Sequence, residues 1–112
     1  MSRQPVETTA GTGRAPTAAD RVRVQYRGTL IDGTEFDSSY ARNEPADFQL
    51  SGVIPCWTEG VQRMKVGGKA RLVCPSDLAY GDRGNDEIPG GAVLVFDIEL
   101  LDVLGAAAPG NQ

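Results

Sequence analysis

Hydrophobic and polar residues alternate along three stretches of the chain, residues 21–30, 69–74 and 92–103. An alternation with a period of two predicts strands, because successive side chains of a strand point to opposite faces of its sheet. We therefore expect one buried and one exposed sheet face. The expected inner residues are Val22, Val24, Tyr26, Leu30, Ala70, Leu72, Cys74, Leu94, Phe96, Ile98 and Leu100. In the first stretch the expected outer residues are Arg21, Arg23, Gln25, Arg27 and Thr29.

Turn-forming residues separate these strands. The Asp32–Gly33 pair stands between hydrophobic residues, which is a strong signal for a hairpin. Residues 37–47 and 76–91 are interrupted by Ser, Asn, Gly and Pro, so they predict two long loops. Two further short strands are expected, at residues 6–9 and 48–50.

One segment has the spacing of a helix. Trp57, Val61 and Met64 follow each other at intervals of four and three residues, and Pro55 suits the first helical turn. The sequence therefore predicts a helix over residues 55–64 whose hydrophobic stripe faces the sheet.

Length and composition favour one small domain. The chain has 112 residues, of which 40% are hydrophobic, enough for a single core. The 14 glycines and 7 prolines favour turns and short strands. We predict an α+β fold, a twisted antiparallel sheet covered on one face by a short helix. Residues 1–5 are expected to form a flexible arm, most of residues 10–20 a surface segment, and residues 105–112 a disordered tail.

Composition also excludes several functions. The chain has no histidine, so it lacks a Ser-His-Asp triad and the usual zinc sites. Its net charge is -4 and its basic residues form no stripe, so we expect no nucleic-acid partner. No hydrophobic run approaches the roughly 18 residues of a membrane span. The N-terminus shows no export signal, so the chain as given is expected to be cytoplasmic, or periplasmic if a signal was removed.

Two cysteines, Cys56 and Cys74, are too few for a four-thiolate metal site. The favoured interpretation is that both are small buried residues. A disulfide between them stays open, because it requires α-carbons within about 7 Å.

The candidates for chemistry are few. Asp37 directly follows Phe36, which places a carboxylate at the edge of an apolar element. Aromatic side chains from strand, helix and loop could converge near it, and they could equally be ordinary core residues. These aromatic residues are Tyr26, Phe36, Trp57, Tyr80 and Phe96.

Three blocks of the chain, in this order, carry a family resemblance: VRVQYRGTLIDGTEFDSS, VIPCWTEGVQRMKVGGKARLVCPSDLAYG and IPGGAVLVFDIELLDV. They resemble the FKBP-type peptidyl-prolyl cis-trans isomerase domain, over roughly residues 6–104. The VIPxWTEG form is most similar to bacterial members of the macrophage infectivity potentiator type. The resemblance implies a twisted antiparallel sheet of five to six strands wrapped around one short helix. It also implies isomerisation of X-Pro bonds without a cofactor or metal.

The resemblance further implies a pocket for a prolyl ring. Trp57 would form its floor, and Asp37 and Tyr80 its polar rim. Tyr80 would hydrogen-bond a substrate carbonyl, the backbone N–H of Ile54 would hold another, and Asp37 would join a network with Tyr26 and Arg42. Ile88 would close the site from the second long loop. The other implied wall residues are Tyr26, Phe36, Val53, Ile54 and Phe96.

The implied partners are proline-containing peptides and unfolded proteins, with macrolides of the rapamycin class as candidate inhibitors. The chain lacks the helical dimerisation arm of its bacterial relatives, so a monomer is expected. Several positions depart from the best-known members and alter the pocket rim: Ala46, Cys56, Glu87 and Gly90–Gly91. The alternative function is therefore a proline-docking or chaperone-like module that binds without catalysis.

Overall fold

The structure is a computed structural model, and it describes residues 6–85 and 88–106. The expected arm at residues 1–5, the departure at Glu87 and most of the expected tail lie outside these residues. The elements are β1 (Val6–Thr9), β2 (Asp20–Leu30), β3 (Glu35–Ser38), β4 (Ala46–Gln49), η1 (Leu50–Gly52), α1 (Pro55–Val61), β5 (Lys69–Cys74), η2 (Ser76–Leu78) and β6 (Leu94–Ala106).

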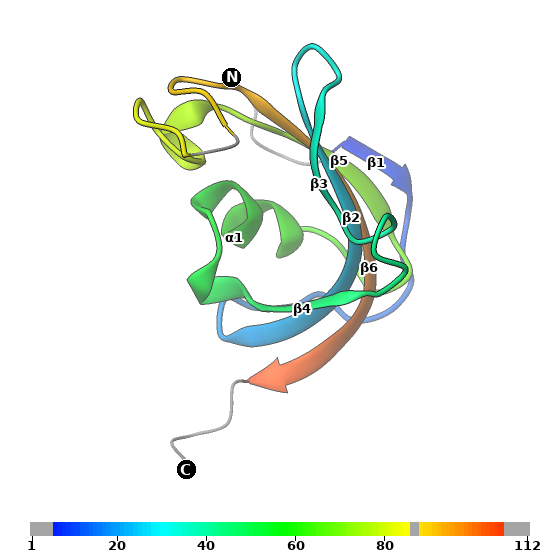
Figure 1. The fold of residues 1–112 in the computed structure, drawn as a ribbon. Helices are drawn as coiled ribbons and strands as arrows, with labels where there is room; N and C mark the ends of the chain where they lie inside the picture. The colour runs from blue at the N-terminus through cyan, green and yellow to red at the C-terminus, as the bar shows by residue number, and fades with distance from the viewer. Residues whose placement is uncertain (1–5, 86–87, 107–112) are drawn as a thin grey trace.

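The strands form one six-stranded antiparallel sheet, which confirms the α+β fold. Their order is β1-β5-β6-β2-β3, and β4 also pairs with β2. The longest pairing joins β2 to β6, from Asp20 opposite Ala106 to Leu30 opposite Leu94. Figure 1 shows the sheet curving around α1, which lies on its concave side.

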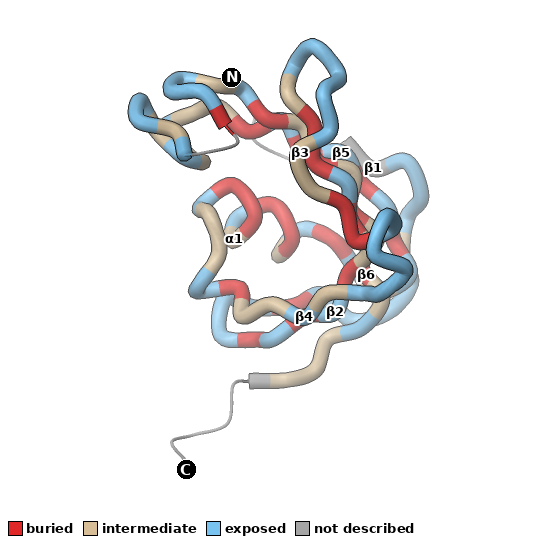
Figure 2. The backbone as a smooth tube through the Cα atoms, viewed as in Figure 1, coloured by how far each residue is buried: buried red, intermediate tan, exposed pale blue. Residues whose placement is uncertain are grey.

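The alternating pattern places the core between the sheet and α1, as Figure 2 shows by burial. The inner residues of β5 and β6 are buried as expected, and Leu30 of β2 is partly buried. Thr29 departs from the pattern, because it is only 9% exposed although it faces outward by spacing. It lies on β2 between β3 and β6, paired with Glu35 on one side and Val95 on the other. The β2–β3 register shifts between Gly28 and Thr29, and the Thr29 hydroxyl donates to the Val95 carbonyl at 3.5 Å.

The helix α1 is shorter than the expected range of residues 55–64. It ends at Val61, and Met64 follows in a tight turn in which its N–H donates to the Val61 carbonyl at 3.0 Å. Trp57, Val61 and Met64 are nevertheless all buried. The hydrophobic stripe is thus confirmed, while the predicted helix end is wrong.

The segment expected as a loop over residues 37–47 instead contributes to two strands. Its first two residues belong to β3 and its last two to β4, both paired with β2. Between them, Ser39 is fully buried. Its hydroxyl accepts a hydrogen bond from the Tyr26 N–H at 2.7 Å and donates one to Gln25 Oε1 at 2.5 Å. The polar residues of this segment therefore pair and hydrogen-bond with β2, which their polarity alone does not indicate.

Two segments near the chain ends are held by backbone hydrogen bonds. Gly13 N–H donates to the Val66 carbonyl, and Val66 N–H donates to the Arg14 carbonyl, each at 3.0 Å. This double hydrogen bond holds the segment before β2 against the turn that follows α1. At the other end, β6 continues to Ala106, two residues into the expected tail, because Gly105 pairs with Arg21.

Cys56 and Cys74 form a disulfide, with α-carbons 5.7 Å apart. Their burial confirms one half of the favoured interpretation, but they are not free thiols. The disulfide ties the first turn of α1 to the end of β5. It forms because α1 packs against the inner face of the sheet and brings Cys56 beside Cys74 of β5, a juxtaposition that the sequence does not show.

Candidate active site

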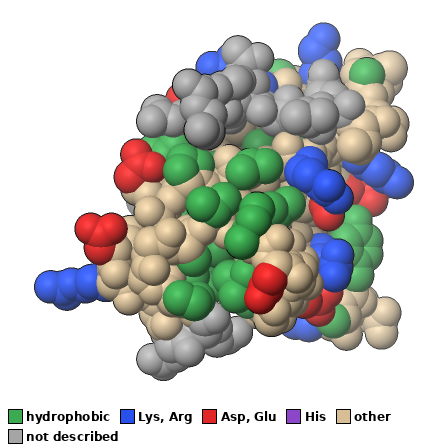
Figure 3. Space-filling view, turned by 90° about the horizontal axis from the view of Figure 1, so that it is seen from above, with side chains coloured by type: hydrophobic (Ala, Val, Ile, Leu, Met, Phe, Trp, Pro, Cys, Tyr) green, Lys and Arg blue, Asp and Glu red, His purple; other side chains and the backbone are tan. Residues whose placement is uncertain are grey.

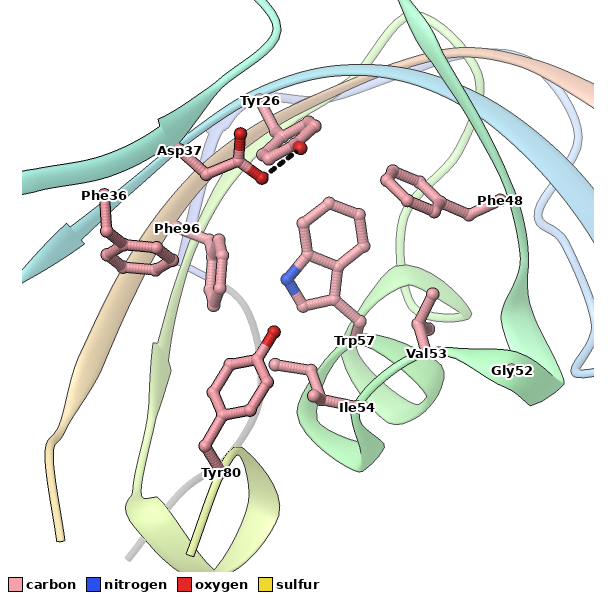
Figure 4. Close-up of a pocket in the computed structure, with 10 residues that line it drawn as sticks. All are labelled: Tyr26, Phe36, Asp37, Phe48, Gly52, Val53, Ile54, Trp57, Tyr80 and Phe96. Carbon is pink, nitrogen blue, oxygen red and sulfur yellow. Dashed lines mark hydrogen bonds between the residues drawn. The ribbon is translucent and has the colours of Figure 1, made fainter. Parts of the chain in front are cut away.

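A pocket of about 370 Å³ opens between α1, the strands β2, β3, β4 and β6, and the loop that follows η2. Its wall is mostly aromatic and aliphatic, and three of its side chains carry polar groups, those of Tyr26, Asp37 and Tyr80. Figure 3 shows one face of the molecule, on which hydrophobic side chains gather in the middle and charged groups lie mainly around them. The lining residues, drawn in Figure 4, are Tyr26, Phe36, Asp37, Phe48, Gly52, Val53, Ile54, Trp57, Tyr80 and Phe96.

The rings of the pocket pack edge to face around Trp57. The centroid of the Trp57 ring lies 5.2 Å from that of Tyr26, 5.3 Å from that of Phe48 and 5.3 Å from that of Phe96. Phe36 in turn packs on Phe96 at 5.6 Å. Such T-shaped pairs match the positive edge of one ring to the negative face of the next. The rings therefore form one connected wall, with the indole at its centre.

Trp57 is held from the backbone side as well. Its N–H and that of Thr58 donate to the Ile54 carbonyl, at 3.0 and 3.1 Å, which starts α1 at Pro55. The Thr58 hydroxyl also donates to the Leu50 carbonyl at 2.5 Å. These bonds join η1, the Val53–Ile54 segment and α1 into one unit, so the floor and the adjacent wall keep a fixed relation.

The Trp57 Nε1–H is buried, and no hydrogen-bond acceptor faces it among the described residues. The near-perpendicular Phe96 ring, at an interplanar angle of 89°, is its aromatic neighbour. Tyr26 and Phe48 pack on the same indole at 5.2 and 5.3 Å. Within the described residues this N–H is therefore an unpaired donor in an aromatic surrounding.

Asp37 sits in a three-residue network at the pocket edge. The Tyr26 hydroxyl donates to Asp37 Oδ2 at 2.5 Å, shown as a dashed line in Figure 4. Arg42 donates to Asp37 Oδ1 at 2.6 Å and to the Tyr26 hydroxyl oxygen at 3.1 Å. Arg42 also stands 5.7 Å above the Tyr26 ring. The network fixes the carboxylate against β2.

This network keeps its groups in their ordinary charge states. Burial alone would raise the pKa of Asp37, but hydrogen bonds from Tyr26 and Arg42 outweigh it, and the net effect lowers the pKa below 3.8. Burial raises the pKa of Tyr26 above 10.0, and its bond to Asp37 adds to this. The rim thus presents an ionised carboxylate and a neutral phenol at neutral pH.

Tyr80 is the other polar group of the pocket. It follows η2, its side chain is 40% exposed, and its hydroxyl points toward the centre of the ring cluster in Figure 4. The hydrogen bonds described for residues 6–85 and 88–106 include none made by this hydroxyl. The group is therefore placed to bind whatever enters the pocket.

Most of the residues expected at the site do meet in one pocket. The structure brings together Tyr26, Phe36, Asp37, Val53, Ile54, Trp57, Tyr80 and Phe96. Ile88 does not line it: its side chain is 3% exposed and packs in the core cluster. The loop folds over the core, so its hydrophobic residue points inward instead of toward the opening.

Two lining residues were not expected, Phe48 and Gly52. Phe48 lies on β4, a strand of four residues whose partner, Val22 of β2, is distant in sequence. Its aromatic character was a usable signal, but only the pairing with β2 brings it beside Tyr26, with ring centroids 5.8 Å apart.

Among the described residues there is no group of His, Cys, Asp or Glu side chains that could hold a metal ion. None of the helices in that part of the chain is long and apolar enough to cross a membrane.

Comparison with known proteins bears directly on this pocket. The family model of FKBP-type peptidyl-prolyl cis-trans isomerase matches residues 12–101. The chain is 60% identical over 94 residues to the FKBP-type peptidyl-prolyl cis-trans isomerase FkpA of Escherichia coli K12. That match covers 84% of this chain and 35% of the relative, so the chain spans about a third of the relative's length.

Two solved structures are similar in fold and sequence. The crystal structure of FkpA from Escherichia coli matches with a TM-score of 0.88 and 56% identity, over 90% of this chain and 47% of that one. A peptidyl-prolyl cis-trans isomerase from Pseudomonas syringae pv. tomato matches with a TM-score of 0.83 and 48% identity, over 88% of this chain and 73% of that one.

Proposed function

The chain belongs to the FKBP-type peptidyl-prolyl cis-trans isomerase family, and we propose that its aromatic pocket accelerates rotation about X-Pro bonds in peptides and unfolded proteins. One observation carries the proposal. The pocket joins a ring-lined floor of a size suited to a prolyl ring with a hydroxyl, that of Tyr80, directed into it.

The reaction needs no reactive side chain. Rotation about an X-Pro bond breaks amide resonance against a barrier of roughly 18–20 kcal/mol, but it breaks no covalent bond. A planar amide has a larger dipole than a twisted one, so transfer from water into an apolar pocket disfavours the planar form relative to the twisted one. About 4 kcal/mol of such differential binding accelerates rotation about a thousandfold.

We assign roles to the lining residues on this basis. Trp57 supports the prolyl ring from below, and Phe36 and Phe96 enclose it. Tyr80 donates a hydrogen bond to a carbonyl beside the proline, and the N–H of Ile54 binds a second carbonyl. Holding the chain on both sides of the bond while the ring is gripped favours the twisted geometry. Asp37, fixed by Tyr26 and Arg42, sets the polar edge against which the rotating carbonyl turns.

We further propose that the protein works in an oxidising compartment outside the bacterial cytoplasm. The buried Cys56–Cys74 disulfide supports this, because such bonds persist in oxidising compartments and are rare in the cytosol. The periplasm therefore replaces the cytoplasm as the favoured location. Macrolides of the rapamycin class remain candidate inhibitors of the same pocket.

The function is tested with a short peptide that contains one X-Pro bond, in an assay in which a protease cleaves only the trans form. We expect the slow cleavage phase to accelerate in proportion to protein concentration. Acceleration should disappear in a variant that fills the pocket, Val53→Trp, if this variant keeps its fold by circular dichroism. Binding of the peptide without acceleration would instead identify a proline-docking module.

A further inference from the structure

Gly28 lies outside the pocket lining, behind two of its rings. It is buried on the inner face of β2, two residues after Tyr26. In the sheet it is paired with Asp37 of β3 on one side and with Phe96 of β6 on the other. The residue thus sits between the two strands that carry the Phe36 and Phe96 walls.

Glycine is needed at this position because there is no room for a side chain, not because of its backbone conformation. Gly28 is absent from the glycines with positive φ, so an L-residue could adopt its backbone angles. A Cβ atom at Gly28 would, however, lie 2.7 Å from Phe36 Cζ and 2.9 Å from Phe96 Cε1. Both distances are shorter than any ordinary carbon contact. Even an alanine therefore forces at least one ring to move.

Movement of either ring reaches the pocket floor. Phe36 and Phe96 pack edge to face, and Phe96 packs on Trp57 in the same manner. A methyl group behind the first pair pushes the rings toward the cavity or apart, which changes the wall around the prolyl ring. Displacements of about 1 Å at a reacting site can cost up to about a hundredfold in rate.

We propose that Gly28 is a positioning residue for the pocket: it leaves room for Phe36 and Phe96 to close over β2 and hold the indole of Trp57 in place. This role rests on the proposed function for its effect on catalysis. The ring arrangement itself can be measured without any activity.

The experiment compares Gly28→Ala with a matched control, Gly13→Ala. A Cβ at Gly13 would also meet a side-chain carbon at 2.7 Å, the Cβ of Val66, but none of the pocket residues is among its neighbours. Gly13 likewise has no positive φ. Both variants place one methyl group 2.7 Å from a side-chain carbon, so a general cost of crowding appears in both.

Three readouts are taken on fully folded protein. For Gly28→Ala we expect kcat/KM toward a proline peptide to fall by about tenfold or more. We also expect its near-ultraviolet circular dichroism and fluorescence to change, since Trp57 is the single tryptophan. Gly13→Ala should keep the wild-type kcat/KM and the wild-type Trp57 spectra. Equal losses in the two variants, or wild-type kcat/KM and spectra in Gly28→Ala, would overturn the proposal.

A double-mutant cycle with Phe36→Leu tests whether Gly28 acts through the rings. Leucine removes Phe36 Cζ and Cε1, which are two of the three ring atoms that the new methyl would strike, and it leaves Phe96 Cε1 in place. Gly28→Ala should therefore change the Trp57 spectrum and peptide affinity less in the Phe36→Leu background than in wild type. Identical changes in both backgrounds contradict the proposal.

Folding failure is informative in the same cycle. If Gly28→Ala alone does not fold, recovery of folding in the Phe36→Leu background supports the role. Failure there and also in a Phe36→Leu/Phe96→Leu background, which lacks all three ring atoms that the methyl would strike, opposes it. If wild-type protein shows no isomerase activity, the proposed function fails. The spectra and peptide affinity still decide the positioning role of Gly28.

Discussion

Trp57 belongs at once to the core and to the pocket, since it is 4% exposed and still lines the cavity. Trp57→Ala should lower the free energy of unfolding by about 3–5 kcal/mol, because it removes a large buried side chain. It should also abolish binding of a proline peptide. Urea unfolding and calorimetric titration measure the two effects.

The matched control for Trp57 is Met64→Ala. Met64 is fully buried on the same stripe but does not line the pocket. We expect a loss of about 2–5 kcal/mol in unfolding free energy, with peptide affinity kept at conditions where the variant is folded. A Trp57→Ala variant with wild-type stability and affinity would place the floor elsewhere.

Tyr80 should contribute to catalysis without contributing to stability. Its side chain is 40% exposed, so the fold gains little from its hydroxyl. Tyr80→Phe removes one hydrogen bond to the substrate, worth about 1 kcal/mol, and should lower kcat/KM about fivefold. The unfolding midpoint should stay unchanged. A large shift of that midpoint, with kcat/KM preserved, would mean that the hydroxyl serves the loop instead of the substrate.

At the level of elements, the sequence predicted best where one sheet face is buried. The strand β5 was predicted with its bounds, and the inner face of β6 residue by residue, because alternation reports burial on one side. The short strands β3 and β4 have only four residues each and are fixed by pairing with β2, so the local pattern underestimates them.

The residues of the candidate site also fall into those that the local pattern could place and those that it could not. Residues on well-patterned elements, such as Tyr26 and Trp57, could be placed on an inner face from spacing alone, and the family resemblance assigned them to a pocket. Phe48 and Ile88 depend instead on how β4 pairs with β2 and on how the long second loop packs, which no local pattern encodes. The Cys56–Cys74 disulfide likewise depends on how α1 packs against β5.

The disulfide joins α1 to β5 and closes a loop with a sequence separation of 18 residues. A cross-link of this length stabilises by about 3 kcal/mol, mainly by restricting the unfolded chain. We expect Cys56→Ala/Cys74→Ala to lose about this much unfolding free energy, measured by urea titration. In the presence of a reductant, the unfolding midpoint of the wild-type protein should shift toward that of the variant, because the disulfide becomes reduced once the chain unfolds. An unfolding midpoint that is the same in the variant and the oxidised wild type would contradict this account.

For the molecule as a whole, the charge states predict a simple pH profile. The pKa of Asp37 lies below its usual 3.8, so the carboxylate is ionised throughout neutral pH and is protonated only in strong acid. The pKa of Tyr26 lies above 10.0, so the phenol stays neutral. The chain has no histidine. We expect kcat/KM to be nearly constant from about pH 6 to 9. A steep bell-shaped profile would indicate acid-base catalysis.

In the proposed mechanism, an apolar, ring-lined pocket speeds X-Pro rotation by preferring the twisted bond, with no proton transferred. Exchange NMR on a peptide with one X-Pro bond, at catalytic amounts of protein, measures this rotation in both H₂O and D₂O. We expect exchange well above the spontaneous rate and nearly the same acceleration in both solvents. Exchange at the spontaneous rate, or catalysis substantially slower in D₂O, would rule the mechanism out.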